Sequence, residues 1–188
     1  MEVKTLSKNR VYDGFFKIDE ATIEHERFNG ETQTIKRLCF ERGDAVAAVV
    51  FDKNTNEFLF TEQFRYPAFS RSGETTMLEL VAGMQEQGEH HLDCLKREVV
   101  EELGYSLDRS IYLGCFFLSP GGSSERVHLY YAEIGEKIGT GGGKLEENED
   151  IKIVRLSQSE MTERLYGDGF NDAKTQLGLL MSRVSQNG

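Results

Sequence analysis

Three glutamates, Glu98, Glu101 and Glu102, stand at positions i, i+3 and i+4 of one segment, the spacing of a shared patch on a helix surface. Apolar residues from Leu92 to Leu103 recur at helical spacing and predict a stripe that packs on a core. This stripe lies on a different face of the helix from the glutamates. Neighbouring carboxylates repel by roughly a few tenths of a kcal/mol per pair unless a cation lies among them. Mg2+ fits best, with Mn2+ as an alternative, because it accepts a few carboxylates and keeps other positions for water and phosphate oxygens.

Glycines flank this segment on both sides. Gly104 predicts the end of the helix, and Gly83 opens a loop in which the backbone can come close to a metal ion or a phosphate. An acidic helix face is more often plain solvated surface. The combination of Gly83, Glu89, Arg97 and the three glutamates in fixed register argues against that alternative here.

Apolar runs predict the strands that position the helix. A nearly continuous run over residues 45–51 has the pattern of a central strand, and a short strand leads into Gly83. Strands around one helix, with a terminal helix on the other face, indicate an α/β sandwich. The expected strands are 16–28, 32–40, 45–51, 57–64, 77–81, 111–118, 127–134 and 151–156; the further helices are 157–166, with a Ser157/Glu160 capping box, and 172–184; residues 65–76 are expected to form a polar loop.

The first 43 residues predict a small antiparallel β meander with a hairpin turn at Asn29-Gly30. A short sheet of this kind buries little by itself and needs a partner, either the following domain or the same domain of a second subunit. We therefore expect two parts. Residues 1–43 form a dimerisation meander, whose strands could be exchanged between subunits, and residues 44–188 form the domain that carries the glutamates.

Composition limits the class of protein. The net charge is −10, from 32 acidic and 22 basic residues, which argues against binding to a nucleic-acid backbone. The longest apolar run has the length of a strand and not of a membrane span, and the first ten residues lack the apolar core of a signal peptide. Cys39, Cys94 and Cys115 form no CxxC pair and are expected to be reduced thiols. We expect a cytoplasmic protein that does not bind a membrane.

A glycine-rich and then acidic segment, 135–148, precedes the last strand. Its composition predicts either a mobile loop that closes over a ligand or a disordered connector. Glu146, Glu147, Glu149 and Asp150 gather around its end. An acidic run is often a solvated turn, but beside the glutamate-rich helix we favour a catalytic loop.

The segment from Gly83 to Tyr105 resembles the signature of the Nudix hydrolases. The resemblance implies the Nudix fold, an α/β/α sandwich on a mixed sheet. It also implies hydrolysis of a nucleoside diphosphate linked to another group, by attack of water on one phosphorus. Tyr105 departs from the pattern, because the family usually has an aliphatic residue there, although a tyrosine can still pack.

Two branches of the family are similar to the rest of the chain. EQFR at 62–65, LELVAGM at 78–84, SPGGSSER at 119–126 with its proline at position 120, and ENEDI at 147–151 resemble ADP-ribose pyrophosphatases. GGG at 141–143, His128 and DAKT at 172–175 resemble GDP-mannose pyrophosphatases and related UDP-sugar enzymes. Both branches imply homodimers with a nucleotide-sugar substrate. A regulator that binds nucleotide sugars without hydrolysing them is a further alternative, although the intact signature argues against it.

The resemblance also assigns metal ligands. Glu98 and Glu102 are expected to be the principal ligands of Mg2+. Glu101 assists them, Glu149 is contributed when the loop closes, and the carbonyl of Ala82 adds one oxygen.

Catalytic and substrate-binding roles follow from the same resemblance. Arg97 is expected to hold the helix carboxylates in place, and Glu147 to act as the general base, with its acidic neighbours and the helix carboxylates as alternatives. Arginines suit phosphate oxygens, since their planar fork can bind two of them, and an aromatic ring can stack on a base. The residues assigned to the substrate are Phe15, Arg37, Arg65, Glu125 and Lys174; a core phenylalanine and an exposed helix lysine are the alternatives for the first and last.

Overall fold

The computed structural model describes residues 1–167 and 169–186 and divides into two compact units. Residues 1–44 and 117–126 form the first unit, and residues 45–116 with those from 127 onward form the second. The expected boundary at 43/44 lies one residue from this division. The segment 117–126 joins the first unit although it is far from it in the sequence.

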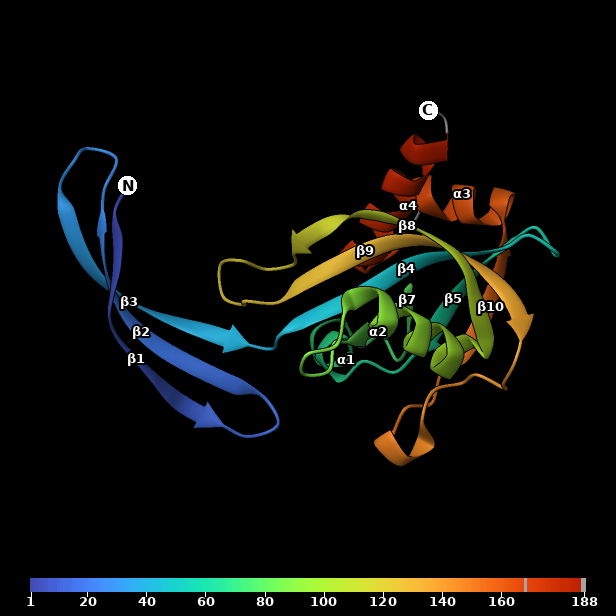
Figure 1. Cartoon of the computed structure of the whole chain (residues 1–188), viewed down its shortest axis with the longest axis horizontal. Coiled ribbons are helices and arrows are strands. Elements are labelled where there is room, and N and C mark those ends of the chain that lie inside the picture. Colours follow the sequence, from blue (N-terminus) through green and yellow to red (C-terminus); the bar gives the residue numbers. More distant parts are fainter. Residues whose placement is uncertain (168, 187–188) are drawn as a thin grey trace. The chain divides into compact units, whose positions relative to one another are not determined.

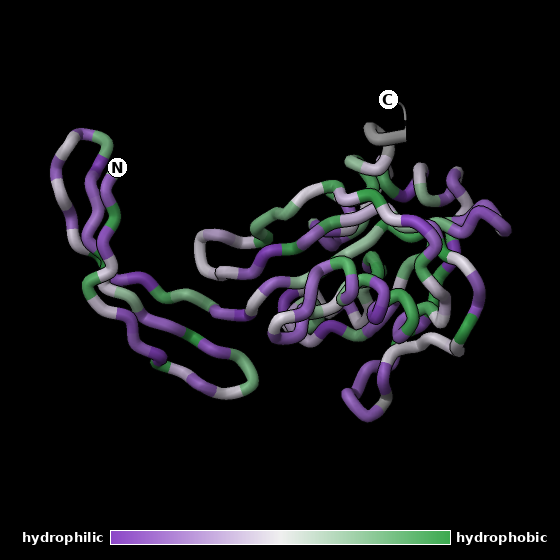
Figure 2. Tube along the Cα trace, viewed as in Figure 1, coloured by the Kyte–Doolittle hydropathy of each residue, from purple (hydrophilic) through white to green (hydrophobic). Residues whose placement is uncertain are grey.

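The first unit is built on a three-stranded antiparallel sheet in the order β1-β2-β3. The hairpin turn predicted at Asn29-Gly30 is confirmed, because Gly30 has a φ of +86° and its N–H donates to the carbonyl of Arg27 (2.9 Å). Every residue of β1 is exposed, and Figure 2 colours most of these strands as hydrophilic. The strands are β1 (Val3–Asp13), β2 (Lys17–Glu26) and β3 (Thr32–Glu41).

The segment 117–126 is attached to the end of β3 by backbone hydrogen bonds. The N–H of Phe40 donates to the carbonyl of Gly122 (2.8 Å), and the N–H of Ser124 donates to the carbonyl of Phe40 (3.1 Å). The chain turns over residues 120–122, where a sharp turn was expected. Arg126 then binds both carboxylate oxygens of Asp44, so the segment is fixed within the first unit.

The second unit contains a seven-stranded sheet with the path β10-β5-β4-β9-β8. Two short strands, β6 and β7, are added by antiparallel pairing with β5 and β4. The strands are β4 (Asp44–Asp52), β5 (Glu57–Gln63), β6 (Met77–Glu79), β7 (Val81–Met84), β8 (Tyr105–Phe117), β9 (Arg126–Lys137) and β10 (Lys152–Ser157); the helices are α1 (Tyr66–Ser72), α2 (His91–Glu98), the π-helical turn η1 (Val99–Leu103), the 3-10 turn η2 (Leu145–Glu147), α3 (Gln158–Tyr166) and α4 (Ala173–Gln186).

The central strand β4 contributes to a core on each face of the sheet. Val46, Ala48 and Val50 pack in a buried cluster with residues of α2 and η1, and Ala47 and Val49 pack in a second cluster with residues of α3 and α4. Successive side chains of a strand point to opposite faces, so one apolar run fills both cores. Figure 1 shows α2 on one side of the sheet and α3 and α4 on the other. The expected α/β/α sandwich on a mixed sheet is confirmed.

Several local features differ from the sequence-based expectations, among them β1, which precedes the first expected strand. Residues expected as a polar loop contain α1, which begins with Pro67 in its first turn and ends at Gly73 with a φ of +78°. The strand expected over 77–81 is divided at Leu80 into β6 and β7, since the chain changes its partner from β5 to β4 there. The strand β8 begins directly after Gly104, six residues earlier than expected. No residue of α1 is buried, so apolar periodicity carried no signal for it.

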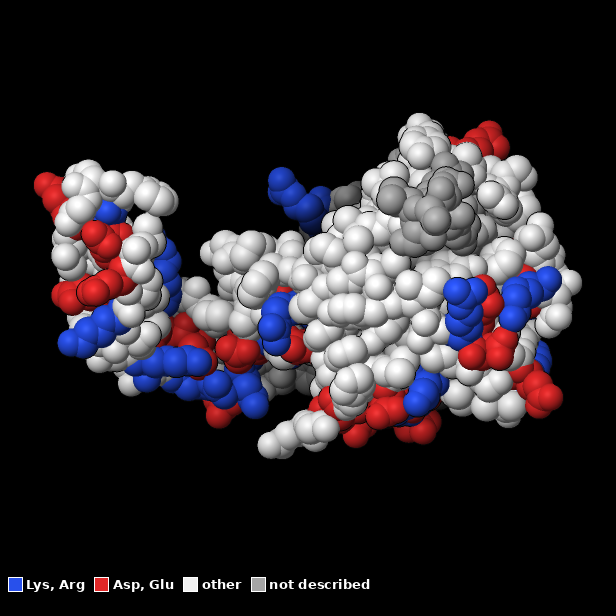
Figure 3. Space-filling view, turned by 45° about the horizontal axis from the view of Figure 1, so that its top comes forward, with Lys and Arg blue, Asp and Glu red and all other residues white. Residues whose placement is uncertain are grey.

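The capping box of α3 is confirmed, because Ser157 accepts from the N–H of Glu160 and the Glu160 side chain accepts from the N–H of Ser157. Cys39, Cys94 and Cys115 are free thiols. Figure 3 shows acidic and basic side chains lying side by side on one face of the second unit. Among the residues described, no helix is both long and apolar enough to cross a membrane.

Candidate active site

The three predicted carboxylates lie where α2 passes into a π-helical turn. The α-helix ends at Glu98 and η1 continues it over the next five residues, so the helix predicted from the spacing is not α-helical throughout. Glu98 and Glu102 are buried, with 8% and 3% of their surface exposed, while Glu101 is only partly buried. The apolar stripe of this helix is in the core, as expected. Single π-helical turns occur frequently at functional sites.

Burial sets the protonation behaviour of the two buried carboxylates. Burial raises the pKa of Glu102 well above its usual value, and the nearby carboxylates of Glu98 and Glu149 raise it further. The pKa of Glu98 is also raised, first by burial, although Arg97 opposes the shift. The N–H of Ala82 donates to Oε2 of Glu102 (3.2 Å), which ties the helix to β7. Two buried carboxylates with raised pKa values are a group that a cation would stabilise.

The glycine at position 83 leaves room for a side chain of the helix. A Cβ atom there would overlap the carboxylate of Glu98. The sequence predicted close approach of this backbone to a metal ion or a phosphate, and the structure adds the Glu98 carboxylate as a reason for the glycine. Any side chain at this position would displace a predicted metal ligand.

Arg97 connects the carboxylates with the loop that precedes the helix. One terminal nitrogen donates to Glu98 (2.7 Å) and Glu101 (3.2 Å), and the other donates to the carbonyl of Met84 (3.1 Å). Its Nε and Nη2 also form a two-bond pair with Glu89 (3.1 and 3.0 Å). The predicted role of Arg97, holding the helix carboxylates, agrees with this geometry, and Glu89 is a site residue to which sequence reasoning assigned no role.

We expect Glu89→Gln to make stability less sensitive to acid. The Arg97 guanidinium lowers the pKa of Glu89 from 4.5 to about 2, so the ion pair stabilises the protein above pH 4.5 and this contribution is lost as the pH falls towards 2. The variant should lose about 2 kcal/mol of unfolding free energy at neutral pH and show a shallower decline in acid. Urea unfolding at neutral and acidic pH measures both. Glu86→Gln is the control, since the exposed Glu86 lies 4.0 Å from Arg97; an equal effect there would contradict the prediction.

The glycine-rich segment is fixed to the end of the helix. The N–H groups of Gly142 and Gly143 donate to the carbonyls of Glu102 (2.9 Å) and Glu101 (3.1 Å), and that of Gly139 donates to the carbonyl of Gly104 (2.9 Å). These bonds satisfy carbonyls that a helix end leaves without partners. The sequence predicted mobility here from glycine content, whereas the structure explains glycines 141 and 143 by positive φ angles and by close packing, against backbone atoms at 141 and side-chain atoms at 143.

We expect Gly141→Ala to destabilise the protein by about 2–3 kcal/mol. A Cβ at Gly141 would lie 2.5 Å from the carbonyl carbon of Leu103, and the residue has a φ of +68°. The free energy of unfolding in urea measures the loss. Gly121→Ala is the matched control, because nothing lies within 4 Å of its Cβ position; a variant at 141 that unfolds like the control would disprove the close packing.

The acidic end of the same loop faces the helix through Lys144. Its ammonium group binds Glu101 (2.8 Å) and Glu147 (3.4 Å), and its backbone N–H donates to Glu149 (3.2 Å). Glu147 is 59% exposed, and the charge of Glu149 acts on both Glu98 and Glu102. The structure therefore brings the predicted loop residues to the helix carboxylates, with Lys144 as a contact that sequence reasoning missed.

The donor set fits a hard divalent cation. Glu98, Glu101, Glu102 and Glu149 offer carboxylate oxygens, and two of these groups are buried with raised pKa values. Arg97 and Lys144 hold oxygens of Glu98 and Glu101 in this conformation. Within the described residues, no three His, Cys, Asp or Glu side chains converge on one cation position.

Two predicted substrate residues meet at a carboxylate that sequence reasoning missed. Arg65, at the N-cap of α1, binds one oxygen of Glu79 (2.7 Å), and Lys174, in the first turn of α4, binds the other (2.6 Å). Glu79 is only 4% exposed. The sequence signal for Glu79 was its position as the single acidic residue in the apolar run of 77–82. A carboxylate buried in such a run requires partners, which could have suggested its pairing with cations.

The remaining predicted substrate residues belong to the first unit. Phe15 is 94% exposed in the turn between β1 and β2, which rejects its reading as a core residue. Arg37 is exposed on β3, and Glu125 forms an ion pair with Arg42 (3.6 Å). Their approach to a substrate stays a prediction.

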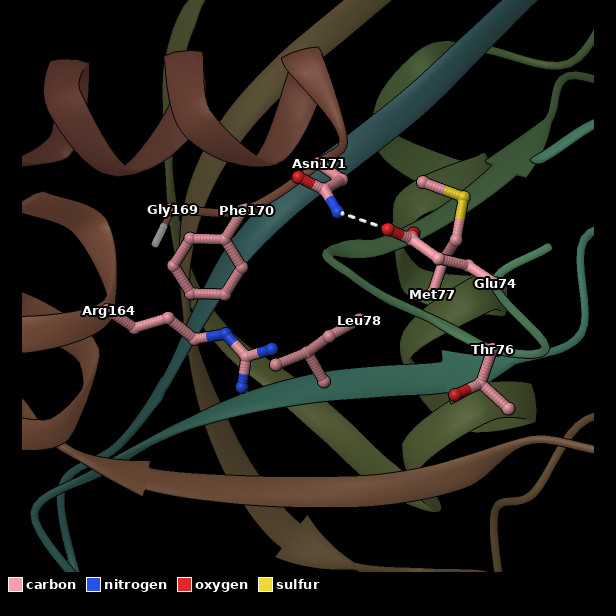
Figure 4. Close-up of a pocket in the computed structure, with 8 residues that line it drawn as sticks. All are labelled: Glu74, Thr76, Met77, Leu78, Arg164, Gly169, Phe170 and Asn171. Carbon is pink, nitrogen blue, oxygen red and sulfur yellow. Dashed lines mark hydrogen bonds between the residues drawn. The ribbon is translucent and has the colours of Figure 1, made fainter. Parts of the chain in front are cut away.

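A pocket of about 210 Å3 is present elsewhere in the second unit (Figure 4). The Arg164 guanidinium of α3 lies 5.5 Å from the ring centroid of Phe170, and the side-chain amide of Asn171 donates to Glu74 (2.9 Å) across the pocket. None of the predicted site residues lines it.

The chain is similar to several known proteins. The NUDIX domain family model matches residues 41–170. The chain is 35% identical to the ADP-ribose pyrophosphatase of Escherichia coli K12 over 161 residues, covering 85% of this chain and 77% of the relative. It is 28% identical to the GDP-mannose pyrophosphatase of Pectobacterium atrosepticum over 174 residues, covering 92% and 90%. A solved structure described as an ADP compounds hydrolase shares the fold, with a TM-score of 0.78, 19% identity and coverage of 100% and 96%. The chain belongs to the Nudix family.

Proposed function

We propose that this chain hydrolyses the diphosphate linkage of a nucleoside diphosphate sugar, with ADP-ribose as the preferred substrate and AMP and ribose 5-phosphate as products. The observation that carries the proposal is the pair of buried carboxylates, Glu98 and Glu102, in the Nudix helix. Buried carboxylates of raised pKa beside further acidic groups are an arrangement for binding divalent cations with a diphosphate.

The chain's own residues have distinct parts in this reaction. Glu147 takes the proton from the attacking water, whose oxygen forms a bond to one phosphorus as the bridging P–O bond breaks. Arg97 holds Glu98 and Glu101 in position, and the bond from Ala82 N–H orients Glu102. The exposed position of Glu147 on a loop is compatible with movement towards the substrate.

Mg2+ is the proposed cofactor, held by Glu98, Glu101, Glu102 and Glu149 with the carbonyl of Ala82. When bound it supplies positive charge that neutralises the diphosphate and lowers the pKa of water. Lys144 and Arg97 also provide positive charge beside Glu101.

The choice of ADP-ribose rests on sequence similarity. The ADP-ribose pyrophosphatase of E. coli K12 is 35% identical, whereas the GDP-mannose pyrophosphatases of P. atrosepticum and Salmonella arizonae are 28% and 30% identical. GDP-mannose is the second candidate, because those relatives cover 92% of the chain and Lys174 is held in an ordered network. The three consecutive glycines support neither substrate, since the packing of the loop explains at least two of them.

Release of phosphate tests the proposal directly. Purified protein with Mg2+ and alkaline phosphatase is supplied with ADP-ribose or GDP-mannose at equal concentration, since the phosphatase acts on the products and spares the intact diphosphates. Faster release from ADP-ribose is the expected result. Faster release from GDP-mannose would reverse the substrate choice, and release from neither would favour a nucleotide-sugar-binding regulator.

We also propose that the chain forms a homodimer through the first unit. The exposed β1 carries Val3, Leu6, Val11 and Tyr12, all large apolar residues. A second copy would cover this surface and could bring Phe15 and Arg37 to the substrate of its partner. Sedimentation at micromolar concentration should show dimers, and a monomer would remove the shared-site argument.

A further inference from the structure

We infer that Glu79 is a positioning residue that sets Arg65 and Lys174 as a paired site for the diphosphate of the substrate. The inference rests on the proposed function and adds to it a residue that does not itself touch the substrate. The two cations come from segments more than one hundred residues apart in the sequence, and one carboxylate brings them together.

The contacts of Glu79 divide its two oxygens between the two cations. Oε2 accepts from Nε of Arg65, and Oε1 accepts from the Lys174 ammonium. The Glu79 side chain is 5% exposed, whereas that of Arg65 is 39% exposed. Among the described residues, Arg65 makes this side-chain bond only through Nε. Its terminal nitrogens are therefore available to a phosphate, while Nε fixes the plane of the guanidinium.

The start of α4 locks Lys174 from the other side. Asp172 accepts from the N–H and hydroxyl of Thr175 (3.0 and 2.5 Å) and also binds the Lys174 ammonium (3.0 Å). The hydroxyl of Thr175 accepts from the N–H of Leu80 (3.0 Å), the residue that follows Glu79. The bonds form a closed ring from β6 to α4 and back. Asp172 and Thr175 thus help to hold Lys174 beside Glu79.

The position of this pair relates it to the metal-binding carboxylates. Glu79 ends β6, and β7 follows after one residue and carries Ala82, whose N–H binds Glu102. Glu79, which binds Arg65, therefore lies three residues before the backbone N–H that binds Glu102.

If Glu79 had only a structural role, the two cations would serve only to compensate the cost of burying its negative charge. The test therefore asks whether Glu79 acts through the two cations on an anionic ligand. Adenosine diphosphate is the probe, and its dissociation constant is measured calorimetrically in Mg2+ buffer for the full chain. Glu79→Gln should weaken binding about tenfold, or about 1.4 kcal/mol. It should raise KM for ADP-ribose more than it lowers kcat, and leave Mn2+ affinity unchanged.

Asp52→Asn is the matched control. Asp52 is as buried as Glu79, with 4% of its surface exposed, and it forms an ion pair with Arg155 (2.9 Å). It lies at the end of β4, whereas β7 pairs with the beginning of that strand. This variant should lose stability without losing affinity for adenosine diphosphate. In an Arg65→Met/Lys174→Met background, adding Glu79→Gln should weaken binding no further, because the residues through which Glu79 acts are gone.

Unchanged or tighter binding by Glu79→Gln would overturn the inference, as would an equal loss in Asp52→Asn or no binding by the wild type. If Glu79→Gln does not fold, Glu79→Asp keeps the charge and moves it by one methylene; it should still weaken binding, and wild-type affinity in that variant would also overturn the inference. Hydrolysis by the wild type is scored separately. If the wild type is active and Glu79→Gln binds adenosine diphosphate normally, only the inference is overturned. If the wild type is inactive but its binding of adenosine diphosphate depends on Glu79, only the proposed function is overturned.

Discussion

We expect Glu102→Gln to lower kcat for nucleotide-sugar hydrolysis by about a thousandfold and, without divalent cations, to raise the free energy of unfolding. Glu102 is nearly fully buried, and burial with neighbouring carboxylates raises its pKa. The glutamine keeps the size and an oxygen that can accept from Ala82 N–H but removes the buried charge. The same charge that costs stability without a cation is the one that would bind the proposed metal ion.

The pH dependence gives this prediction a definite sign. A carboxyl whose folded pKa is raised above 4.5 contributes stability below pH 4.5, and that contribution is lost as the pH rises through the folded pKa. Metal-free wild type should therefore lose stability over this range relative to Glu102→Gln. Urea unfolding with a chelator measures the difference, and the phosphate-release assay measures kcat.

Asp52→Asn provides the contrast for Glu102→Gln. Asp52 is also buried, but its pKa is lowered because Arg155, Asn54 and Thr55 outweigh the effect of burial. Its substitution should reduce stability and leave kcat near the wild-type value. A folded Glu102→Gln variant with normal turnover in Mg2+ would remove the assignment of Glu102 as a metal ligand.

We expect Arg97→Ala to destabilise the protein by about 3–5 kcal/mol and to reduce turnover strongly. The guanidinium binds three carboxylates and the carbonyl of Met84. Without it, the buried Glu98 loses its only cation partner among the described residues, and the loop that contains Glu89 loses its ion pair with the helix. Both stability and metal-ligand geometry should suffer.

Arg97→Lys separates charge from geometry in this prediction. An ammonium keeps the positive charge but cannot form the two-bond pair with Glu89 while also reaching Glu98 and Met84. We expect it to recover part of the stability and little of the turnover. Urea unfolding and kcat are measured on both variants and on Lys96→Ala, whose exposed partner is Asp93 one turn away. An Arg97→Ala variant as stable as Lys96→Ala would show that the ion-pair cluster is not structural.

The apolar pattern of the sequence predicted the framework because burial decides where strands and the main helix form. The residues of β4 alternate between two cores, and Leu95, Val99 and Leu103 are buried as expected. The π-helical turn could not be predicted in this way, since Leu95, Val99 and Leu103 recur every four residues, a spacing that an α-helix also accommodates. The short helix α1 buries no residue, so only its Pro67 and Gly73 marked it.

The site was predictable where the family signature extends and less so outside it. Arg97 and the three glutamates lie in fixed register, whereas Glu79 and Lys144 act through partners distant in sequence, such as Lys174 and Glu101. A sequence without a contact map does not pair such residues. Tyr105, which departs from the signature, has a local reason, because its hydroxyl accepts from Arg155 (2.8 Å).

The docking of the glycine-rich segment on the helix end divides the loop into an anchor and a tip. Residues 139–143 share backbone hydrogen bonds with residues 101–104, so these two segments cannot change length or course independently. The tip, residues 144–150, carries Glu147 and Glu149 on a backbone outside these bonds to the helix. Exchange of the tip alone between Nudix relatives is therefore the change most suited to moving the proposed base, Glu147, while the carboxylates of the helix stay in register.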